Sequence, residues 1–233
     1  MKKIFFCFFT VMMAVLCIGL VSCKKDDLKE VDDQGLTEDI RDFMPEDIIQ
    51  EVERLGLTIY GGNTPPDITG TYFTSPNILK DSNIDDPSDI GSLQFNDATV
   101  IFSEQDNKNL TIQVFQDHLR DESDGGSGVG GYIVGKDKNF TVFVKLLDVD
   151  THGHEALVAM LYSGTISDAG IINLHIATIM IDDGGDPHNN LINIGGSRLI
   201  YDQDGLSERK SSTKSLLKQS ENMLPGILSI QKN

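Results

Sequence analysis

The sequence contains no tryptophan and only three cysteines, Cys7, Cys17 and Cys23, all near the amino terminus. The absence of tryptophan argues against a carbohydrate-binding module built on stacked tryptophan rings. If the segment before Cys23 is removed and Cys23 carries a lipid, no thiol is left for a disulfide. The stability of the exported domain must then come from its packed core alone.

Basic side chains are also scarce in the body of the chain. Between Leu57 and Gly205 there are seven Lys or Arg residues against 22 Asp or Glu residues, a net charge of −15. A surface of this sign repels the phosphate backbone of DNA and RNA. Nucleic acid is therefore excluded as a partner.

The motifs of common hydrolases are missing as well. No Gly-x-Ser-x-Gly elbow occurs, and Ser163-Gly164 has no visible base beside it. The many carboxylates of the body make accidental pairs inevitable, so no pair can be assigned to glycoside cleavage. We expect a protein without enzymatic activity and without a cofactor, and an unrecognised hydrolase stays open as the last alternative.

The best metal-site candidate is the run His152-Gly153-His154-Glu155. On an extended chain its two histidines share one face, as many two-histidine sites require. However, Gly153 indicates a turn, and a third ligand is not evident. The acidic runs Asp182–Asp186 and Asp202–Gly205 lack the carboxylate spacing of an EF-hand. We interpret all three as turn segments and predict no metal site.

The first residues form three zones, of which Met1-Lys2-Lys3 is positive and Ile4 to Val21 carries no charge. This order is typical of a signal peptide, although the apolar run also approaches the roughly 20 residues of a membrane-spanning helix. The third zone, Leu20-Val21-Ser22-Cys23, resembles the lipobox of bacterial lipoproteins. The resemblance implies that residues 1–22 are removed and that acyl chains on Cys23 hold the protein to a membrane.

The residues after the cysteine refine this expectation. Lys24-Lys25-Asp26-Asp27 is similar to the export signal of surface lipoproteins of the Bacteroidota, which implies an outer-membrane protein that faces the outside of the cell. Residues 23–44 are polar and acidic, and such a composition predicts a solvated, flexible tether.

A short helix is predicted from Pro45 to Leu55. Pro45 suits the first helical position, Glu46 and Asp47 complement the positive end of the helix dipole, and Gly56 supplies a stop. The apolar residues of one helix face are Ile48, Ile49, Val52 and Leu55. We expect this helix to cover one end of the domain.

Strands dominate the remainder, because apolar and polar residues alternate in segments separated by polar turns. Asp168-Ala169-Gly170 is a hairpin signal. Without long intervening helices, the strands must form an antiparallel meander. A meander hides its edges by closing, so the all-β prediction favours an up-and-down barrel over a β-sandwich, and a barrel of about eight strands holds either side chains or one small ligand. The predicted strands are Ile68–Ser75, Ser92–Ser103, Asn109–Gln116, Gly130–Gly135, Phe140–Leu147, Ala156–Ser167, Gly170–Asp182 and Ser197–Tyr201.

Gly70-Thr71-Tyr72 follows the helix and enters the first strand, and it resembles the Gly-x-Trp signature of lipocalins and related calycin barrels. The resemblance extends from about Pro45 to Gly205, with Tyr72 in place of the family's tryptophan. It implies that Gly70 and Tyr72 close the barrel floor beneath a basic residue near the last strand. Arg198 occupies that position, so we predict that its guanidinium lies within about 6 Å of the Tyr72 ring.

Residues 206–233 are rich in Ser and Lys and are expected to dock on the domain, residues 45–205, as a tail. The leading functional hypothesis is a lipid-anchored binding module for a small apolar or amphipathic ligand. The alternative is an accessory protein of a surface complex whose barrel is filled. The size of the internal cavity distinguishes the two.

Overall fold

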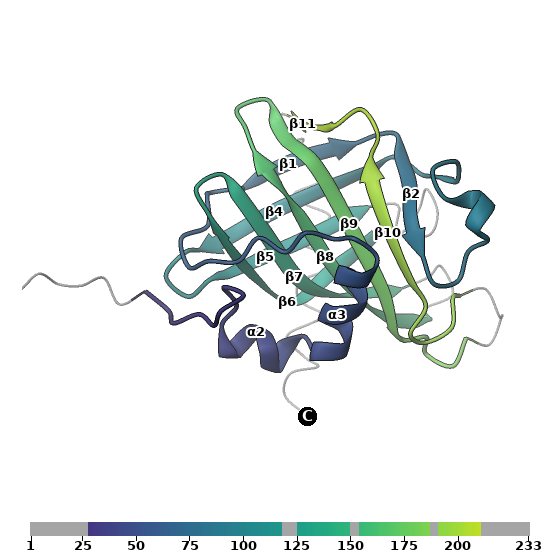
Figure 1. Cartoon of the computed structure of the whole chain (residues 1–233), viewed down its shortest axis with the longest axis horizontal. Helices are drawn as coiled ribbons and strands as arrows, with labels where there is room; N and C mark the ends of the chain where they lie inside the picture. The colour runs from purple at the N-terminus through teal and green to yellow at the C-terminus, as the bar shows by residue number, and fades with distance from the viewer. Residues whose placement is uncertain (1–27, 118–124, 150–153, 187–190, 211–233) are drawn as a thin grey trace, which may run out of the picture.

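A computed structural model describes residues 28–117, 125–149, 154–186 and 191–210. Two helices precede a sheet that accounts for most of these residues (Figure 1). The helices are α2 (Glu38–Phe43) and α3 (Glu46–Arg54), and a 3₁₀ turn, η1, spans Pro87–Asp89. The strands are β1 (Gly70–Thr74), β2 (Asn77–Ser82), β3 (Gln94–Phe95), β4 (Ala98–Asp106), β5 (Thr111–Asp117), β6 (Gly125–Lys136), β7 (Asn139–Val149), β8 (Glu155–Ile166), β9 (Gly170–Asp182), β10 (Ser197–Asp202) and β11 (Leu206–Lys210).

Hydrogen bonding closes the sheet into a ring. β1, β4, β5, β6, β7, β8, β9 and β11 are neighbours in that order, and β11 pairs with both β9 and β1. Every pairing between neighbours in the ring is antiparallel. The prediction of a closed antiparallel meander rather than a sandwich is confirmed.

The wall of the ring continues on one side through β10, β2 and β3. The first residues of β9, Gly170–Ile172, pair with β11, and the following residues, His175–Ile179, pair with β10. β10 in turn pairs with β2, and β2 pairs with β3. Two short strands therefore take the place of a single long strand at the start of the sheet, β1 and β2, and again at its end, β10 and β11.

Side chains that alternate along the strands fill the inside of the ring. Tyr72, Phe102, Phe140 and Tyr162 are all almost completely buried there. Phe102 is central, because its ring lies 5.5 Å from Tyr162, 5.9 Å from Tyr72 and 6.3 Å from Phe140 between centroids. This aromatic cluster is the middle of the inner core.

A second core lies outside the ring, where the two helices pack against its outer face (Figure 1). Ile49 and Val52 of α3 meet Ile179 of β9 and Leu199 of β10 in this cluster. α3 matches the predicted helix, with Pro45 at its N-cap. Its predicted position was wrong, since it covers the outer face of the sheet and not an end of the domain.

The predicted tether also needs correction over residues 36–44. Thr37 caps α2 by accepting a hydrogen bond from the Ile40 amide, and Leu36, Ile40 and Met44 are buried in the outer core. These apolar residues are spread among acidic ones, so composition hides them. Cys23 and the residues up to 27 lie outside the described part of the chain.

The predicted carboxyl-terminal boundary was wrong too, because Leu206–Lys210 forms β11 and completes the ring. β2 was not predicted either, and β6 begins at Gly125 rather than Gly130. The predicted docking of the tail beyond Lys210 concerns residues outside the described part. No helix among the residues described here is long and apolar enough to cross a bilayer.

Candidate functional site

Among the described residues, buried side chains occupy the inside of the ring around the aromatic cluster. One cavity, of about 90 Å³, lies between the inward-facing side chains of Met160 and Ile176 and the rim residues Asn77 and Phe95. Pockets for small molecules measure about 300–1,000 Å³. The cavity lined by these residues is therefore too small for a ligand of ordinary size.

One polar pair is buried in this core. The Tyr162 hydroxyl donates a hydrogen bond of 2.8 Å to Oε1 of Gln116. Complete burial raises the pKa of Tyr162 far above its ordinary value, so the phenol stays protonated and remains a donor. The pair orients Gln116 toward the interior near the small cavity.

Tyr72 does pack against an arginine, but the predicted partner was wrong. The Arg209 guanidinium lies 4.9 Å from the centre of the Tyr72 ring, and its Nη1 donates to the Thr69 carbonyl at 2.9 Å. Arg198 instead forms an ion pair with Asp85 and lies over the Phe95 ring.

The error follows from the misplaced last strand. Arg209 belongs to β11, which pairs directly with β1, whereas Arg198 belongs to β10. Gly70 leaves the space for this contact, because a Cβ there would lie 2.6 Å from Nη1 of Arg209. The basic residue near the end of the ring is thus present, 11 positions later in the sequence than predicted.

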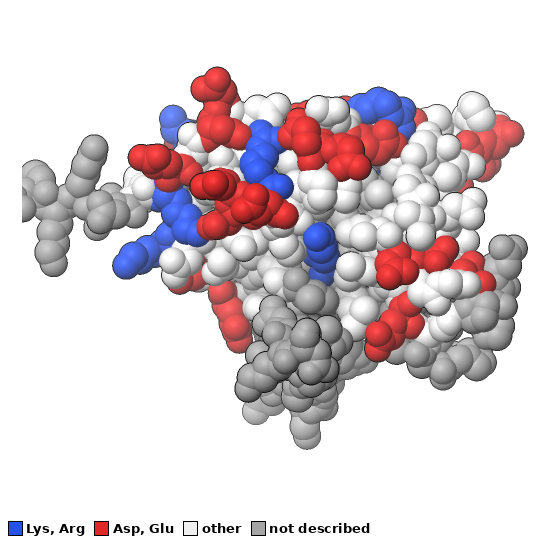
Figure 2. Space-filling model, turned by 90° about the horizontal axis from the view of Figure 1, so that it is seen from below, with Lys and Arg blue, Asp and Glu red and all other residues white. Residues whose placement is uncertain are grey.

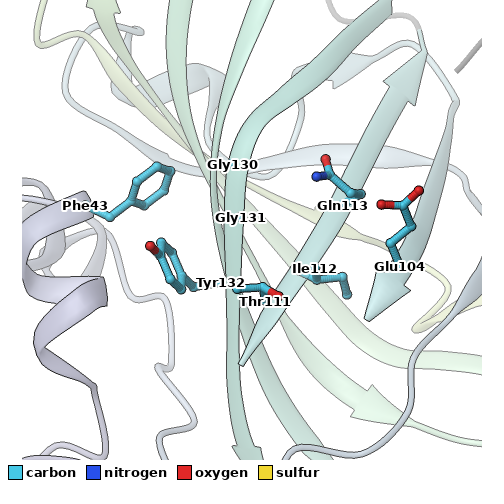
Figure 3. A pocket seen from close by; sticks show the side chains of 8 residues that line it. All are labelled: Phe43, Glu104, Thr111, Ile112, Gln113, Gly130, Gly131 and Tyr132. Atoms are coloured by element: carbon cyan, nitrogen blue, oxygen red, sulfur yellow. The ribbon is translucent and has the colours of Figure 1, made fainter. Parts of the chain in front are cut away.

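A larger hollow, of about 420 Å³, lies on the outer wall where β5 and β6 run side by side (Figure 3). Phe43 and Tyr132 stand on one side of it, and Gln113 and Glu104 stand on the other. The floor consists of Thr111, Ile112, Gly130 and Gly131.

Glycines in β6 create this hollow. The β5–β6 register shifts between the pairs Thr111–Tyr132 and Phe115–Ser127, so β6 has one extra residue there and bulges. Gly130 has a φ of +84°, a conformation that favours glycine. A Cβ on Gly131 would lie 2.6 Å from the Ile112 carbonyl oxygen. Gly130 and Gly131 therefore give this part of the sheet its local shape.

The two sides of the β5–β6 hollow differ in chemistry. The Phe43 and Tyr132 rings meet edge to face, 5.1 Å apart between centroids, and Lys145 Nζ lies 4.9 Å from the centre of the Phe43 ring. The opposite side offers the Gln113 amide and the exposed Glu104 carboxylate. One wall is aromatic, and the other can accept and donate hydrogen bonds.

The charge of the molecule is mostly negative. Acidic side chains predominate on the face of the molecule seen from below, where basic side chains are few (Figure 2). The sequence carries 36 acidic and 19 basic residues in total. This field favours neutral or cationic molecules at the surface except where a basic side chain stands without a carboxylate partner.

The geometry of Ser163 does not suit a nucleophile. Its cross-strand neighbour is His175, the residue type that would serve as a base. However, the Ser163 hydroxyl donates to the Thr58 carbonyl, while both ring nitrogens of His175 contact other groups, Lys80 Nζ and the Asn173 carbonyl. A nucleophile needs a hydrogen bond to its base, and the hydroxyl of Ser163 and the ring of His175 instead bond to separate groups.

The predicted turn segments behave as turns where they are described. Asp182 and Asp183 accept hydrogen bonds from the Gly184 and Gly185 amides, and Asp204 accepts one from the Leu206 amide. Of the histidine candidate, His152 and Gly153 lie outside the described residues. Within the described ranges, no three His, Cys, Asp or Glu side chains are grouped as a metal site requires.

Comparisons with models of protein families, with curated proteins and with solved structures find no match for this chain. A function for this chain is therefore inferred from its sequence and from the geometry of its sites.

Proposed function

We propose that this protein is a non-catalytic binding protein, displayed at the outer-membrane surface through a lipid on Cys23, that binds a small amphipathic ligand in the β5–β6 hollow. The observation that carries the proposal is the contrast in volume between the β5–β6 hollow, about 420 Å³, and the inner cavity, about 90 Å³. The ring then serves as a rigid frame, and the ligand lies on its outer wall rather than inside.

The two-sided chemistry of the hollow supports a ligand with an apolar part and a neutral polar part. The apolar part packs against Tyr132 and Phe43, and hydroxyl groups reach Gln113 and Glu104. A negatively charged head group is disfavoured by Glu104. A packed frame suits this role, because a site on strands is held in place more firmly than a site on loops.

Octyl glucoside, a neutral amphiphile with hydroxyl groups, is the probe for this hollow. The full chain is titrated below the micelle-forming concentration while backbone amide signals are followed by NMR. We expect saturable shifts at Gly130 and Gly131, and Gln113→Ala and Tyr132→Ala each weaken binding by about tenfold, the effect of losing about 1.4 kcal/mol.

The matched control is Gln94→Ala, which removes an exposed glutamine from β3, outside the hollow. This variant keeps the affinity of the parent chain. Shifts confined to residues around the inner cavity would place the ligand inside the ring, and an absence of saturable shifts would remove the proposal for this hollow.

The anchor is tested separately with the full chain in a bacterial host fed radiolabelled palmitate. The parent chain incorporates label and fractionates with the outer membrane, and Cys23→Ala abolishes the labelling. Cys17→Ala is the control: it removes a cysteine of the segment that is cut off before Cys23, so the labelling remains. Unchanged labelling of Cys23→Ala would refute the anchor. External protease then distinguishes display on the outside from retention in the periplasm.

The second candidate function is that of an accessory protein in a surface complex. The filled inner core favours it, as do the exposed apolar side chains of Ile84, Ile90 and Ile194. A stable complex that survives purification from the native membrane, with no response to the amphiphile, would favour this function.

A further inference from the structure

A second hollow, of about 380 Å³, lies on another part of the outer wall, where β2, β9 and β10 pair next to the segment that follows η1. It shares no lining residue with the β5–β6 hollow. Its lining consists of Leu79, Lys80, Ile90, Gly91, His175 and Tyr201. We call it the Lys80 hollow.

Lys80 and His175 form the polar side of the Lys80 hollow. The Lys80 ammonium can only donate, so its Nζ donates to Nε2 of His175 at 2.9 Å. The Asn173 carbonyl can only accept, so Nδ1–H of His175 donates to it at 3.0 Å. The imidazole is therefore neutral and carries its proton on Nδ1.

The burial of the ring agrees with this assignment. Burial, and after it the charge of Lys80, lowers the pKa of His175 below its ordinary value. The imidazole therefore remains a neutral acceptor at neutral pH. It holds the Lys80 ammonium over the hollow and leaves the other two N–H donors of Lys80 for a ligand.

Several lysines of this acidic body form no ion pair within the described residues, and Lys80 is distinguished among them by its contact with a neutral imidazole. Arg198 pairs with Asp85, and Arg41 pairs with Asp32 and Glu46. Among the ion pairs formed within the described ranges, none includes Lys80, whose contact is the neutral His175. Its positive charge is thus available to an anion that comes from solution.

The remaining lining is apolar or aromatic. The rings of His175 and Tyr201 stack with 6.3 Å between centroids and 26° between planes. Ile90, which also lines the hollow, is 43% exposed, and Gly91 beside it adds no side chain that would close the hollow. A flat aromatic floor and an exposed aliphatic rim suit a hydrocarbon chain.

From this arrangement we propose that the Lys80 hollow binds an amphiphile with one carboxylate head and a short apolar chain. Lys80 donates to the carboxylate oxygens, and the chain lies between Ile90 and the Tyr201 ring. His175 is a positioning residue that fixes the direction of the ammonium.

The chemistry of the site selects against other ligands. Lys80 repels cations, and the acidic surroundings penalise a second negative charge on the ligand. A small anion without a chain would leave Ile90 and Tyr201 unused, and an uncharged chain would leave Lys80 unused. A single negative charge joined to an apolar chain uses both sides of the hollow.

Octanoate is the probe, with acetate as the head-only control and octanol as the chain-only control. The full chain is titrated with each compound while the ring signals of Tyr201 and the backbone amide signal of Gly91, both in the lining of the hollow, are followed by NMR. We expect octanoate to shift these signals to saturation and to bind more tightly than acetate or octanol. Lys80→Gln weakens octanoate binding at least about tenfold, the effect of losing one charge-assisted hydrogen bond.

Two variants complete the design. Lys136→Gln removes an exposed lysine at the end of β6 and leaves octanoate binding unchanged. His175→Gln retains an acceptor for Lys80 and keeps part of the affinity, whereas His175→Leu loses it. Lys80 is exposed, so Lys80→Gln leaves the melting temperature close to that of the parent chain and tests binding rather than folding.

The proposal fails if acetate or octanol binds as tightly as octanoate, or if Lys80→Gln leaves the octanoate affinity unchanged. A lipid bilayer is the other source of anionic head groups. Phosphatidylcholine vesicles with and without phosphatidylglycerol are therefore tested in parallel, and binding to the anionic vesicles alone would overturn the proposal of a free amphiphile. Gln113→Ala leaves octanoate binding unchanged, so this hollow and the β5–β6 hollow succeed or fail independently.

Discussion

Replacing Ile40 with alanine tests whether α2 belongs to the folded domain or to a tether. Ile40 is fully buried and packs in the outer core with Leu36, Met44 and Ile49. The substitution removes three carbon atoms, which at about 0.8 kcal/mol each corresponds to a loss of roughly 2.4 kcal/mol in transfer free energy. The cavity left behind adds to this loss, and measured values for such substitutions are about 2–5 kcal/mol.

Urea unfolding followed by circular dichroism measures the effect. With a denaturant slope of about 2 kcal/mol per molar urea, the midpoint falls by about 1–2.5 M. The control is Asp42→Ala, which changes an exposed position of the same helix and shifts the free energy of unfolding by no more than about 0.5 kcal/mol. A shift of that small size for Ile40→Ala would refute the packing of α2 and restore the tether.

Two further substitutions test single interactions. The hydrogen bond from Arg54 is the main reason that the pKa of Glu51 falls from 4.5 to about 2, so this carboxylate stabilises the fold above about pH 4.5, and the contribution is lost as the pH falls toward 2. Glu51→Gln therefore lowers the melting temperature at pH 7 but not near pH 2. The control Glu53→Gln, at an exposed position, has little effect on the melting temperature at either pH. An equal fall in melting temperature at both pH values for Glu51→Gln would contradict the role of this carboxylate. Tyr162→Phe leaves Oε1 of Gln116 buried without its donor, which costs about 1–3 kcal/mol of stability in urea unfolding, and a neutral result would show that water replaces the hydroxyl.

Strand periodicity made most of the ring predictable. In β7 and β9, apolar residues alternate over long segments and the turn between β8 and β9 has a clear signal, so the direction of the chain and the inward faces follow from local sequence. The strands β2 and β11 could not be recognised from the sequence. β11 has the sequence Leu206–Lys210, in which three of five residues are charged, and a strand of this kind is recognised only by the neighbours that pair with it.

The two hollows depend on contacts between distant parts of the sequence. The β5–β6 hollow needs Phe43 of α2 beside Tyr132 of β6, and a bulge that exists only once β5 and β6 are in register. The Lys80 hollow brings together Lys80 and His175, which are 95 positions apart. The glycine run of β6 was a visible signal, but its meaning as a bulge required the partner strand.

The sequence by itself determined the class of the fold and the antiparallel order of most strands, because these follow from periodicity and turn residues, which are properties of neighbouring residues. Only the tertiary structure decided that Arg209 rather than Arg198 covers Tyr72, that residues 36–44 pack on the sheet, and that the larger hollows lie on the outer wall. Side-chain partners across a sheet depend on register and on the strand that closes the ring, and a shift of one strand changes every contact at the closure.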